Sequence, residues 1–415
     1  MPVTDLITPE VCDPLAIRRA GPEVLGLALM DARTRTLAWL SAFDGHSLPS
    51  THAEFDAPLW LAGHVAWFQE WWIARNVQRS RGAGCDPRGP RLPSLDRRAD
   101  AWFDPRTCPR AWRWSASGQD LPARREYLAA TLESTLELLD KTPSSPDGLH
   151  FFRLALHRED EVCEQMAVLA QALDLPAGRY PDFWPAPPTR VLREAIWLPS
   201  QRVQLGGGGL GDSLAGDAWR PAIEDGRVEE SLPEFEIDAQ LVCWAQWAEF
   251  VEDGGYDRQD CWSEAGWQWL QAEGRRAPRY VEQQTGGVMA RAQGRLQKMP
   301  AARPALHLAW HEAHAWCRWA GRRLPCEAEW ALARHAASSR GFAWGDALEW
   351  VADRAALWPG HRPAPGEAVD APLPGQRVLR GASLAAGPRL RHPAARRFAL
   401  PTDDAAFCGF RSCAL

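Results

Sequence analysis

Two histidines and one carboxylate are the side chains of this sequence whose types and spacing could bind a catalytic metal ion. His64 lies in an aromatic segment, and His157 and Glu161 follow about ninety residues later, four positions apart. Two imidazoles and one carboxylate are the ligand set of non-haem iron(II) sites, which leave positions open for substrate and dioxygen. Zinc accepts the same ligands, but no glutamate sits beside His64 in the His-Glu-x-x-His arrangement of zinc hydrolases. We therefore expect Fe(II), provided that the two segments meet.

Helical spacing indicates how the three residues are presented. In a helix over 57–76, His64 belongs to the apolar face, where a core histidine with a hydrogen-bond partner is the alternative to a ligand. In a helix over 148–175, His157 and Glu161 lie one turn apart on a stripe that we expect to look into the helical bundle.

An unpaired carboxylate inside a bundle would cost several kcal/mol, so Glu161 needs a cation. The cation is either a metal ion or an arginine close in sequence, Arg153 or Arg158. His150 and Glu164 are the reserve ligands.

Periodicity and composition divide the chain into two domains. Four helices are predicted within residues 1–175, at 14–43, 57–76, 122–141 and 148–175, with a long loop over 78–121. Residues 176–200 are rich in proline and form the predicted linker. Residues 201–415 are predicted as a loop-rich α+β domain, with short strands near 235–238, 377–380 and 410–413 and helical patches at 243–252 and 309–334.

Composition narrows the class of protein. The 415 residues carry 47 basic and 53 acidic side chains, a net charge of -6, which gives no reason to expect nucleic-acid binding. The sequence contains no signal peptide and no long apolar run, so we expect a cytoplasmic protein without membrane contact. The ten cysteines lack metal-binding spacing and are expected to be reduced. The Gly-x-Gly-x-x-Gly match at 206–211 precedes no helical pattern and is predicted to be a flexible loop, not a nucleotide site.

Several motifs carry a resemblance to a known family. The segment 57–72 resembles the metal-binding helix of the DinB-like domain in ergothioneine-type sulfoxide synthases. The second half resembles their domain of the formylglycine-generating-enzyme (sulfatase-modifying-factor) type. That likeness rests on the segments 250–256, 316–330, 348–350, 378–383 and 407–411.

The resemblance implies a fold of class α plus α+β. A DinB-like four-helix bundle would precede a C-type-lectin-like domain. It further implies an iron(II) enzyme that uses dioxygen to bond a chalcogen to C2 of the imidazole of hercynine, the trimethylated histidine betaine. True formylglycine-generating activity is not expected, because residues 389–398 lack the cysteine pair that binds copper.

Three departures from the family pattern bear on the co-substrate. Glu161 stands where the family usually has a third histidine. The catalytic tyrosine expected before Val378 has no counterpart, since Tyr280 is the last tyrosine of the chain. Where an acidic thiol-binding residue would precede the terminal motif, the chain has Ala405 and Ala406. In these respects the chain is similar to the selenoneine synthase branch, which joins hercynine to a selenosugar.

The resemblance also implies which residues complete the site. A quaternary ammonium favours aromatic faces, and a carboxylate or a sugar favours arginine and similar donors. The implied catalytic candidates are Arg411 and Cys408. The implied substrate-binding residues are Trp350, Arg380, Ser383, Arg396, Phe398 and Phe407.

The sequence is also compatible with three other functions. Within the family, the alternative is a sulfoxide synthase with a thiol co-substrate. A lectin-like binder of a sugar or betaine without catalysis is an alternative of another class. A DinB-type thiol transferase, which would contain zinc, is a third.

Overall fold

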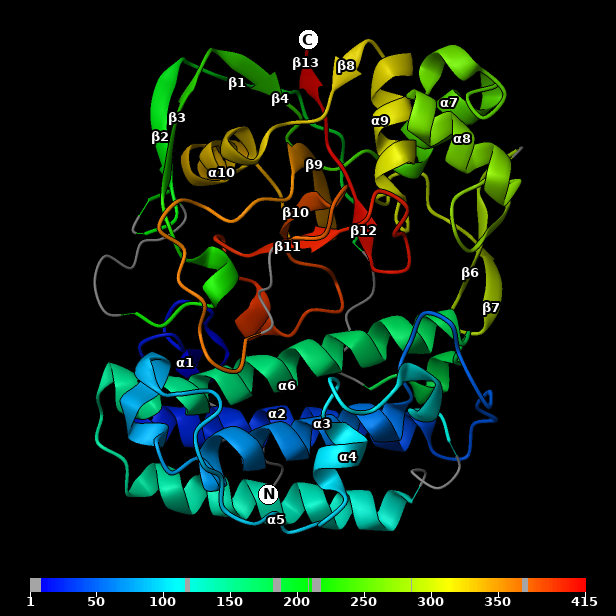
Figure 1. The fold of residues 1–415 in the computed structure, drawn as a ribbon. Helices are drawn as coiled ribbons and strands as arrows, with labels where there is room; N and C mark the ends of the chain where they lie inside the picture. The colour runs from blue at the N-terminus through cyan, green and yellow to red at the C-terminus, as the bar shows by residue number, and fades with distance from the viewer. Residues whose placement is uncertain are drawn as a thin grey trace.

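The computed structural model describes residues 9–115, 120–181, 188–207, 209–210, 218–284, 286–367 and 372–415. A helical N-terminal part lies against a C-terminal part of short strands and helices (Figure 1). The mixed class predicted from the sequence is confirmed, with a helical first part and a second part that contains both strands and helices.

Four long helices form the N-terminal part. They are Pro22–Phe43 (α2), Pro58–Gln69 (α3), Leu121–Asp140 (α5) and Pro146–Ala172 (α6). Each carries a proline in its first turn, where the missing N–H would have had no partner within the helix. Asp120 and Ser145 cap α5 and α6 by accepting backbone N–H groups from Ala123 and Gly148.

The helix boundaries differ from the predicted ones in two places. The first predicted helix starts at Pro22 and not at residue 14, and Pro9–Cys12 forms a separate short helix (α1). The second helix continues past α3 as a π-helical segment, Glu70–Ala74 (η2). In the described residues of the predicted loop 78–121, the helical elements are short: Arg79–Gly84 (η3), Ala99–Phe103 (α4) and Arg110–Trp112 (η4).

Two four-stranded sheets organise the C-terminal part, in the orders β1-β4-β13-β8 and β11-β10-β9-β12. The pairing is antiparallel except between β12 and β9, which are parallel. The strands of the first sheet are Ile196–Leu198 (β1), Phe235–Ile237 (β4), Arg322–Arg323 (β8) and Cys413–Ala414 (β13). Those of the second are Leu348–Arg354 (β9), Arg377–Gly381 (β10), Arg396–Ala399 (β11) and Cys408–Gly409 (β12).

Two smaller sheets complete the strand inventory of the described residues. One pairs Gln201–Leu205 (β2) with Val228–Leu232 (β3). The other contains Val281–Gln283 (β5), Met289–Ala292 (β6) and Arg295–Lys298 (β7). The predicted loop at 206–211 starts directly after β2, and residues 208 and 211 lie outside the described part of the chain.

The helices of the C-terminal part are Trp244–Glu252 (α7), Glu264–Glu273 (α8), Trp310–Trp319 (α9) and Glu327–Ala336 (α10). The helix predicted at 243–252 is present as α7, and α8 was not predicted. The single patch predicted over 309–334 is wrong, since it contains two helices separated by β8. Gly321 adopts a positive φ of 64° directly after α9, a conformation that ends a helix and that glycine adopts without strain.

Helix α6 is the part of the bundle that faces the C-terminal part (Figure 1). Asp160 on α6 accepts two hydrogen bonds from Arg389, at 2.6 and 2.7 Å, and Arg389 belongs to the turn Pro388–Leu390 (η10). Arg18, which lies before α2, pairs at 2.6 Å with Glu224 in the turn Ala222–Glu224 (η7). Because these pairs are buried on both sides, they fix how the two parts of the chain meet.

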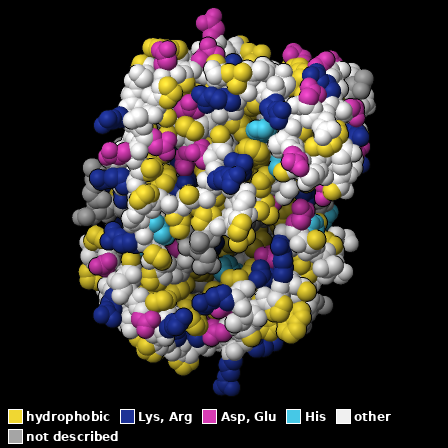
Figure 2. Space-filling view, turned by 45° about the horizontal axis from the view of Figure 1, so that its top comes forward, with side chains coloured by type: hydrophobic (Ala, Val, Ile, Leu, Met, Phe, Trp, Pro, Cys, Tyr) yellow, Lys and Arg dark blue, Asp and Glu magenta, His cyan; other side chains and the backbone are white. Residues whose placement is uncertain are grey.

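The surface and the thiols give little further indication of function. On the face shown in Figure 2, basic and acidic side chains are interspersed. All ten cysteines are free thiols. Of the helices that the structure describes, none combines the length and the apolar character that a membrane span requires.

Candidate functional site

A cavity of about 590 Å³ lies between α6 and the C-terminal part of the chain. Helix α6 contributes one wall, and β11 contributes the opposite one through Arg396, Arg397 and Phe398. The remaining walls come from irregular segments. The other lining residues are Arg18, Leu154, His157, Arg158, Glu161, Gln165, Pro221, Ile223, Glu224, Glu367, Pro372, Leu373, Gln376, Leu390 and Ala395.

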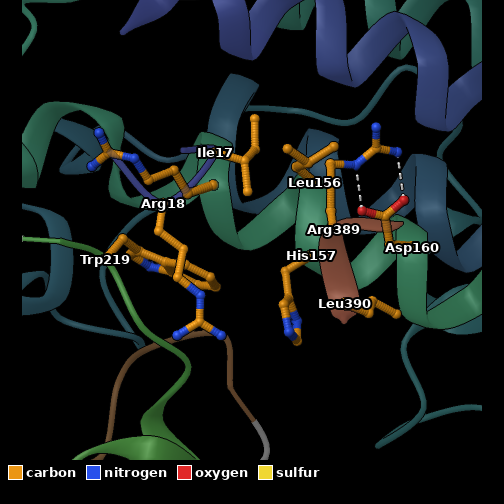
Figure 3. Close-up of a pocket in the computed structure, with 9 residues that line it drawn as sticks. Ile17, Arg18, Leu156, His157, Asp160, Trp219, Arg389 and Leu390 are labelled. Atoms are coloured by element: carbon orange, nitrogen blue, oxygen red, sulfur yellow. Dashed lines mark hydrogen bonds and ion pairs between the residues drawn. The ribbon is translucent and has the colours of Figure 1, made fainter. Parts of the chain in front are cut away.

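His157 also lines a smaller adjoining pocket (Figure 3). Its imidazole extends away from α6, with Arg18 and Trp219 on one side and Leu390 on the other. The centroids of the His157 and Trp219 rings are 5.5 Å apart. His157 therefore stands where the two hollows meet, in contact with residues from both parts of the chain.

His157 and Glu161 occupy neighbouring turns of α6, as the spacing predicted. His157 Nδ1 lies 3.7 Å from Glu161 Oε1, and the side chains are 22% and 29% exposed. The stripe that carries them faces the cavity between the two parts of the chain. The expectation that it faces the bundle interior is wrong, because the C-terminal part covers this side of α6 and leaves the hollow over it.

An arginine supplies the cation that Glu161 requires. Arg158 Nη1 lies 3.0 Å from Glu161 Oε2, and the Arg158 guanidinium also lies over the Phe68 ring at 5.7 Å. Burial alone would raise the pKa of Glu161, but Arg158 and then His157 outweigh it and lower the pKa. Glu161 is therefore ionised, which a metal ligand requires.

His64 is buried on α3 between two indole rings. Its ring centroid lies 5.4 Å from that of Trp60 and 5.7 Å from that of Trp67. His64 Nδ1 lies 2.9 Å from the carbonyl oxygen of Phe103, a hydrogen bond that places the proton on Nδ1 and leaves the Nε2 lone pair free. Burial lowers the pKa of His64 to about 4 and also lowers that of His157, so both imidazoles are neutral at pH 7.

The three predicted ligands match iron(II) in donor chemistry but not in their arrangement. Two neutral imidazoles and an ionised carboxylate are suitable donors. Within the described residues, however, no three or more His, Cys, Asp or Glu side chains come close enough together to hold a metal ion. The carboxylate of Glu161 is turned to Arg158 instead. In this structure, His64, His157 and Glu161 do not form a closed metal site.

The reserve ligands lie apart from the cavity lining. His150 is buried against Phe151, and its Nε2 atom has no hydrogen-bond partner. Glu164 accepts hydrogen bonds from Ser383 Oγ, at 2.5 Å, and from Arg397. Because both of its carboxylate oxygens are bonded, Glu164 links α6 to the C-terminal part.

Arg396 and Phe398 are the two predicted substrate-binding residues that line the cavity. The guanidinium of Arg396 lies 5.0 Å from the centroid of the Phe398 ring and 4.0 Å from that of Trp358. It is fully engaged with Glu327 through hydrogen bonds of 2.9 Å. Phe398 therefore offers an aromatic surface to the cavity, while Arg396 is already paired with a carboxylate that Arg380 shares.

The other predicted residues are not brought to this cavity. Arg411 binds Glu349 through two hydrogen bonds, at 2.6 and 2.8 Å, and both side chains are fully buried. Arg380 pairs with Glu327 and with backbone carbonyl groups. Trp350 donates its indole N–H to the carbonyl of Leu308.

Cys408, Ser383 and Phe407 belong to the same buried framework. The Cys408 thiol donates to the Leu308 carbonyl at 3.2 Å, and burial raises its pKa, so it is a thiol and not a reactive thiolate. Ser383 is committed to Glu164. Phe407 packs on the ring of His307, with the centroids 4.8 Å apart.

Four residues that line the two pockets around His157 were not predicted from the sequence. They are Arg18, Trp219, Glu224 and Glu367. They come from segments without helical or strand periodicity, so no pattern marked them. Glu367 and Asp370 are the two charged residues of the Pro/Gly-rich stretch 363–375, and this contrast was the one signal that could have pointed to Glu367.

Comparison with known proteins finds one family model that matches part of the chain. Residues 194–372 match the family model described as "Sulfatase-modifying factor enzyme 1-like domain". A formylglycine-generating enzyme of Streptomyces coelicolor is 43% identical over 75 residues, which cover 17% of this chain and 23% of that protein.

Two relatives match along almost the whole chain. The hercynine oxygenase of Mycolicibacterium smegmatis is 28% identical, and that of Mycobacterium tuberculosis is 29% identical. Each alignment covers 94% of this chain and 98% of the relative. Among solved structures, PvdO from Pseudomonas aeruginosa covers 55% of this chain and 99% of its own, at 16% identity. The TM-score between the two structures is 0.34.

Proposed function

We propose that the protein uses iron(II) and dioxygen to form a carbon–selenium bond at imidazole C2 of hercynine, with a selenosugar as the co-substrate. The observation that carries the hercynine part is the similarity to hercynine oxygenases over 94% of the chain. A match of that extent includes the helical part, the C-terminal part and the cavity between them.

The cavity is suited in size and lining to a small, charged molecule. Its volume of about 590 Å³ is of the size that small-molecule sites have in proteins. Phe398 supplies an aromatic face for a quaternary ammonium. His157 and Glu161 are partly exposed to the same space and are the ligands proposed there for iron, together with His64.

The proposed iron site requires one rearrangement. Glu161 would have to leave Arg158 and turn toward the imidazoles. The pair to be broken is partly exposed on both sides, so its loss costs less than about 1 kcal/mol. His64 already has the tautomer that a ligand needs, because Phe103 accepts the Nδ1 proton.

The choice of selenium rests on the departures from the sulfoxide synthases. The chain has Ala405 and Ala406 where a thiol-binding acid is expected and no tyrosine after Tyr280. A selenolate is a stronger nucleophile than a thiolate and is more easily oxidised, so it requires less acid–base assistance. With a selenol R–SeH, the balanced reaction with C2–H and O2 gives R–Se(O)–C2 and one water.

A competition between chalcogens tests the proposed function. Protein is loaded anaerobically with Fe(II), hercynine and equal amounts of a selenosugar and a thiol, air is admitted, and products are identified by mass spectrometry. The selenium-bearing hercynine adduct should dominate. Turnover of the thiol alone would assign the protein to the sulfoxide synthases, and binding of hercynine without oxygen consumption would support a non-catalytic betaine binder.

A further inference from the structure

Glu367 differs from every other charged residue of the cavity in having no charged partner. The four arginines that line the cavity are each paired with another carboxylate. The pairs are Arg18 with Glu224, Arg158 with Glu161, Arg396 with Glu327 and Arg397 with Glu164. Because each of these arginines is already held by another carboxylate, none of them is paired with Glu367.

Only one oxygen of the Glu367 carboxyl group is bonded. Glu367 Oε2 accepts the backbone N–H of Ala222 at 2.5 Å, which fixes the orientation of the group. Glu367 Oε1 is buried and has no hydrogen-bond partner among the described residues. An ionised oxygen in that state would cost several kcal/mol, whereas a protonated carboxyl group is neutral and has a hydrogen-bond donor to offer.

Gly366, directly before Glu367, packs closely against the helical bundle beside the same cavity. Gly366 has a positive φ of 90°, and a Cβ atom there would lie 2.8 Å from Leu154 Cδ2 and 3.1 Å from Trp72 Cε2. Leu154 precedes His157 by one turn of α6 and also lines the cavity. The close backbone approach at Gly366 therefore holds Glu367 over the helix that carries His157 and Glu161.

The electrostatic surroundings favour the protonated form. Burial raises the pKa of Glu367 to about 8, the hydrogen bond from Ala222 opposes this shift, and Glu161 adds to it. The charged groups that face Glu367 are Arg158 and Glu161 of α6 and Glu224 of η7. A carboxyl group that is neutral near pH 7 has the property required of a general acid.

We propose that Glu367 is a catalytic acid of this cavity, which turns its buried carboxyl group toward the reacting substrates and donates its proton to them. The assignment rests on the proposed function. In that reaction the proton goes to the oxygen atom that leaves as water. The proton released from C2–H of the imidazole then restores the carboxylic acid, so the group is unchanged over one turnover.

Glu367→Gln tests this role because the amide keeps a carbonyl oxygen for the Ala222 N–H but cannot donate a proton to a reaction. We expect kcat to fall by about 100-fold or more. The KM for hercynine, the iron content and the melting temperature should stay unchanged. Glu367→Asp, which keeps an acidic proton, should recover part of kcat. Glu126→Gln, the same substitution at an exposed residue of α5 outside the cavity lining, should leave kcat unchanged.

An infrared measurement tests the protonated state without turnover. The difference spectrum between wild-type protein and Glu367→Gln at neutral pH should contain a carboxylic-acid carbonyl band, which shifts when hercynine binds. A retained kcat in Glu367→Gln, or a raised KM at unchanged kcat, would overturn the proposal, the latter in favour of a cation-binding carboxylate. If the wild type turns over no chalcogen co-substrate, the proposed function fails. The infrared band then decides separately whether Glu367 carries a proton.

Discussion

The residues predicted on α6 and those predicted in the motifs of the C-terminal part differ in their surroundings. His157 and Glu161 are partly exposed and line a cavity. Arg411 is fully buried and occupied by Glu349, a carboxylate that is fully buried as well. The Arg411 guanidinium also donates to the backbone carbonyls of Asp238 and Ala343, so its hydrogen bonds are made inside the protein. The difference shows that a residue in a recognisable family motif can stabilise the fold and need not contact a substrate.

Replacing Arg411 should have the largest effect on stability. Arg411→Met leaves Glu349 charged and unpaired in the core, which should lower the free energy of unfolding by about 3–5 kcal/mol. Urea denaturation measures the loss. As the control, Arg362→Met removes an 88%-exposed side chain that lies 3.8 Å from Asp225, and it should leave stability unchanged. Equal stability of the two variants would show that Arg411 is not part of the framework.

Replacing Ser383 tests the link between the two parts of the chain. Ser383→Ala removes the hydroxyl that donates to Glu164, and a hydrogen bond to a charged group contributes about 1.5–3 kcal/mol. We expect a loss of that size in thermal unfolding with kcat retained. In the control, Ser134→Ala, the hydroxyl bonds only the carbonyl of Ala130 in its own helix, and no loss is expected. A fall in kcat at unchanged stability would return Ser383 to the substrate-binding residues.

The aromatic wall of the cavity should affect binding more than folding. Phe398→Ala removes the aromatic face, and a cation over such a face gains about 0.5–2 kcal/mol, so the Kd of hercynine should rise about 3- to 30-fold. Titration calorimetry gives the Kd. Phe407→Leu is the counterpart, because Phe407 packs on His307 and should affect stability without changing the Kd. The reverse outcome would exchange the roles of the two phenylalanines.

Arg158→Gln should give the smallest change in stability and the most informative change in metal binding. The Arg158–Glu161 pair is 25% and 29% exposed, so its loss should cost less than about 1 kcal/mol. Since Glu161 is then free to turn toward the imidazoles, iron affinity should rise. Weaker iron binding in this variant would indicate that Arg158 helps to form the site.

The sequence allowed the helical part to be predicted better than the cavity. Apolar periodicity located α5 and α6 to within a few residues, and it placed His157 and Glu161 on one stripe. It did not show that the C-terminal part covers that stripe, because the covering residues lie in irregular segments. Glu224 and Glu367 are positioned by turns and by backbone contacts such as the Ala222 N–H, for which periodicity has no signature.

The central claim is that His157 and Glu161 hold iron, and metal content tests it most directly. Anaerobically prepared wild-type protein should contain one equivalent of Fe(II). The His157→Ala and Glu161→Ala variants should fold normally and lose the metal, whereas His150→Ala should retain it. Iron retained in the His157 and Glu161 variants, or zinc in the wild type, would contradict the account.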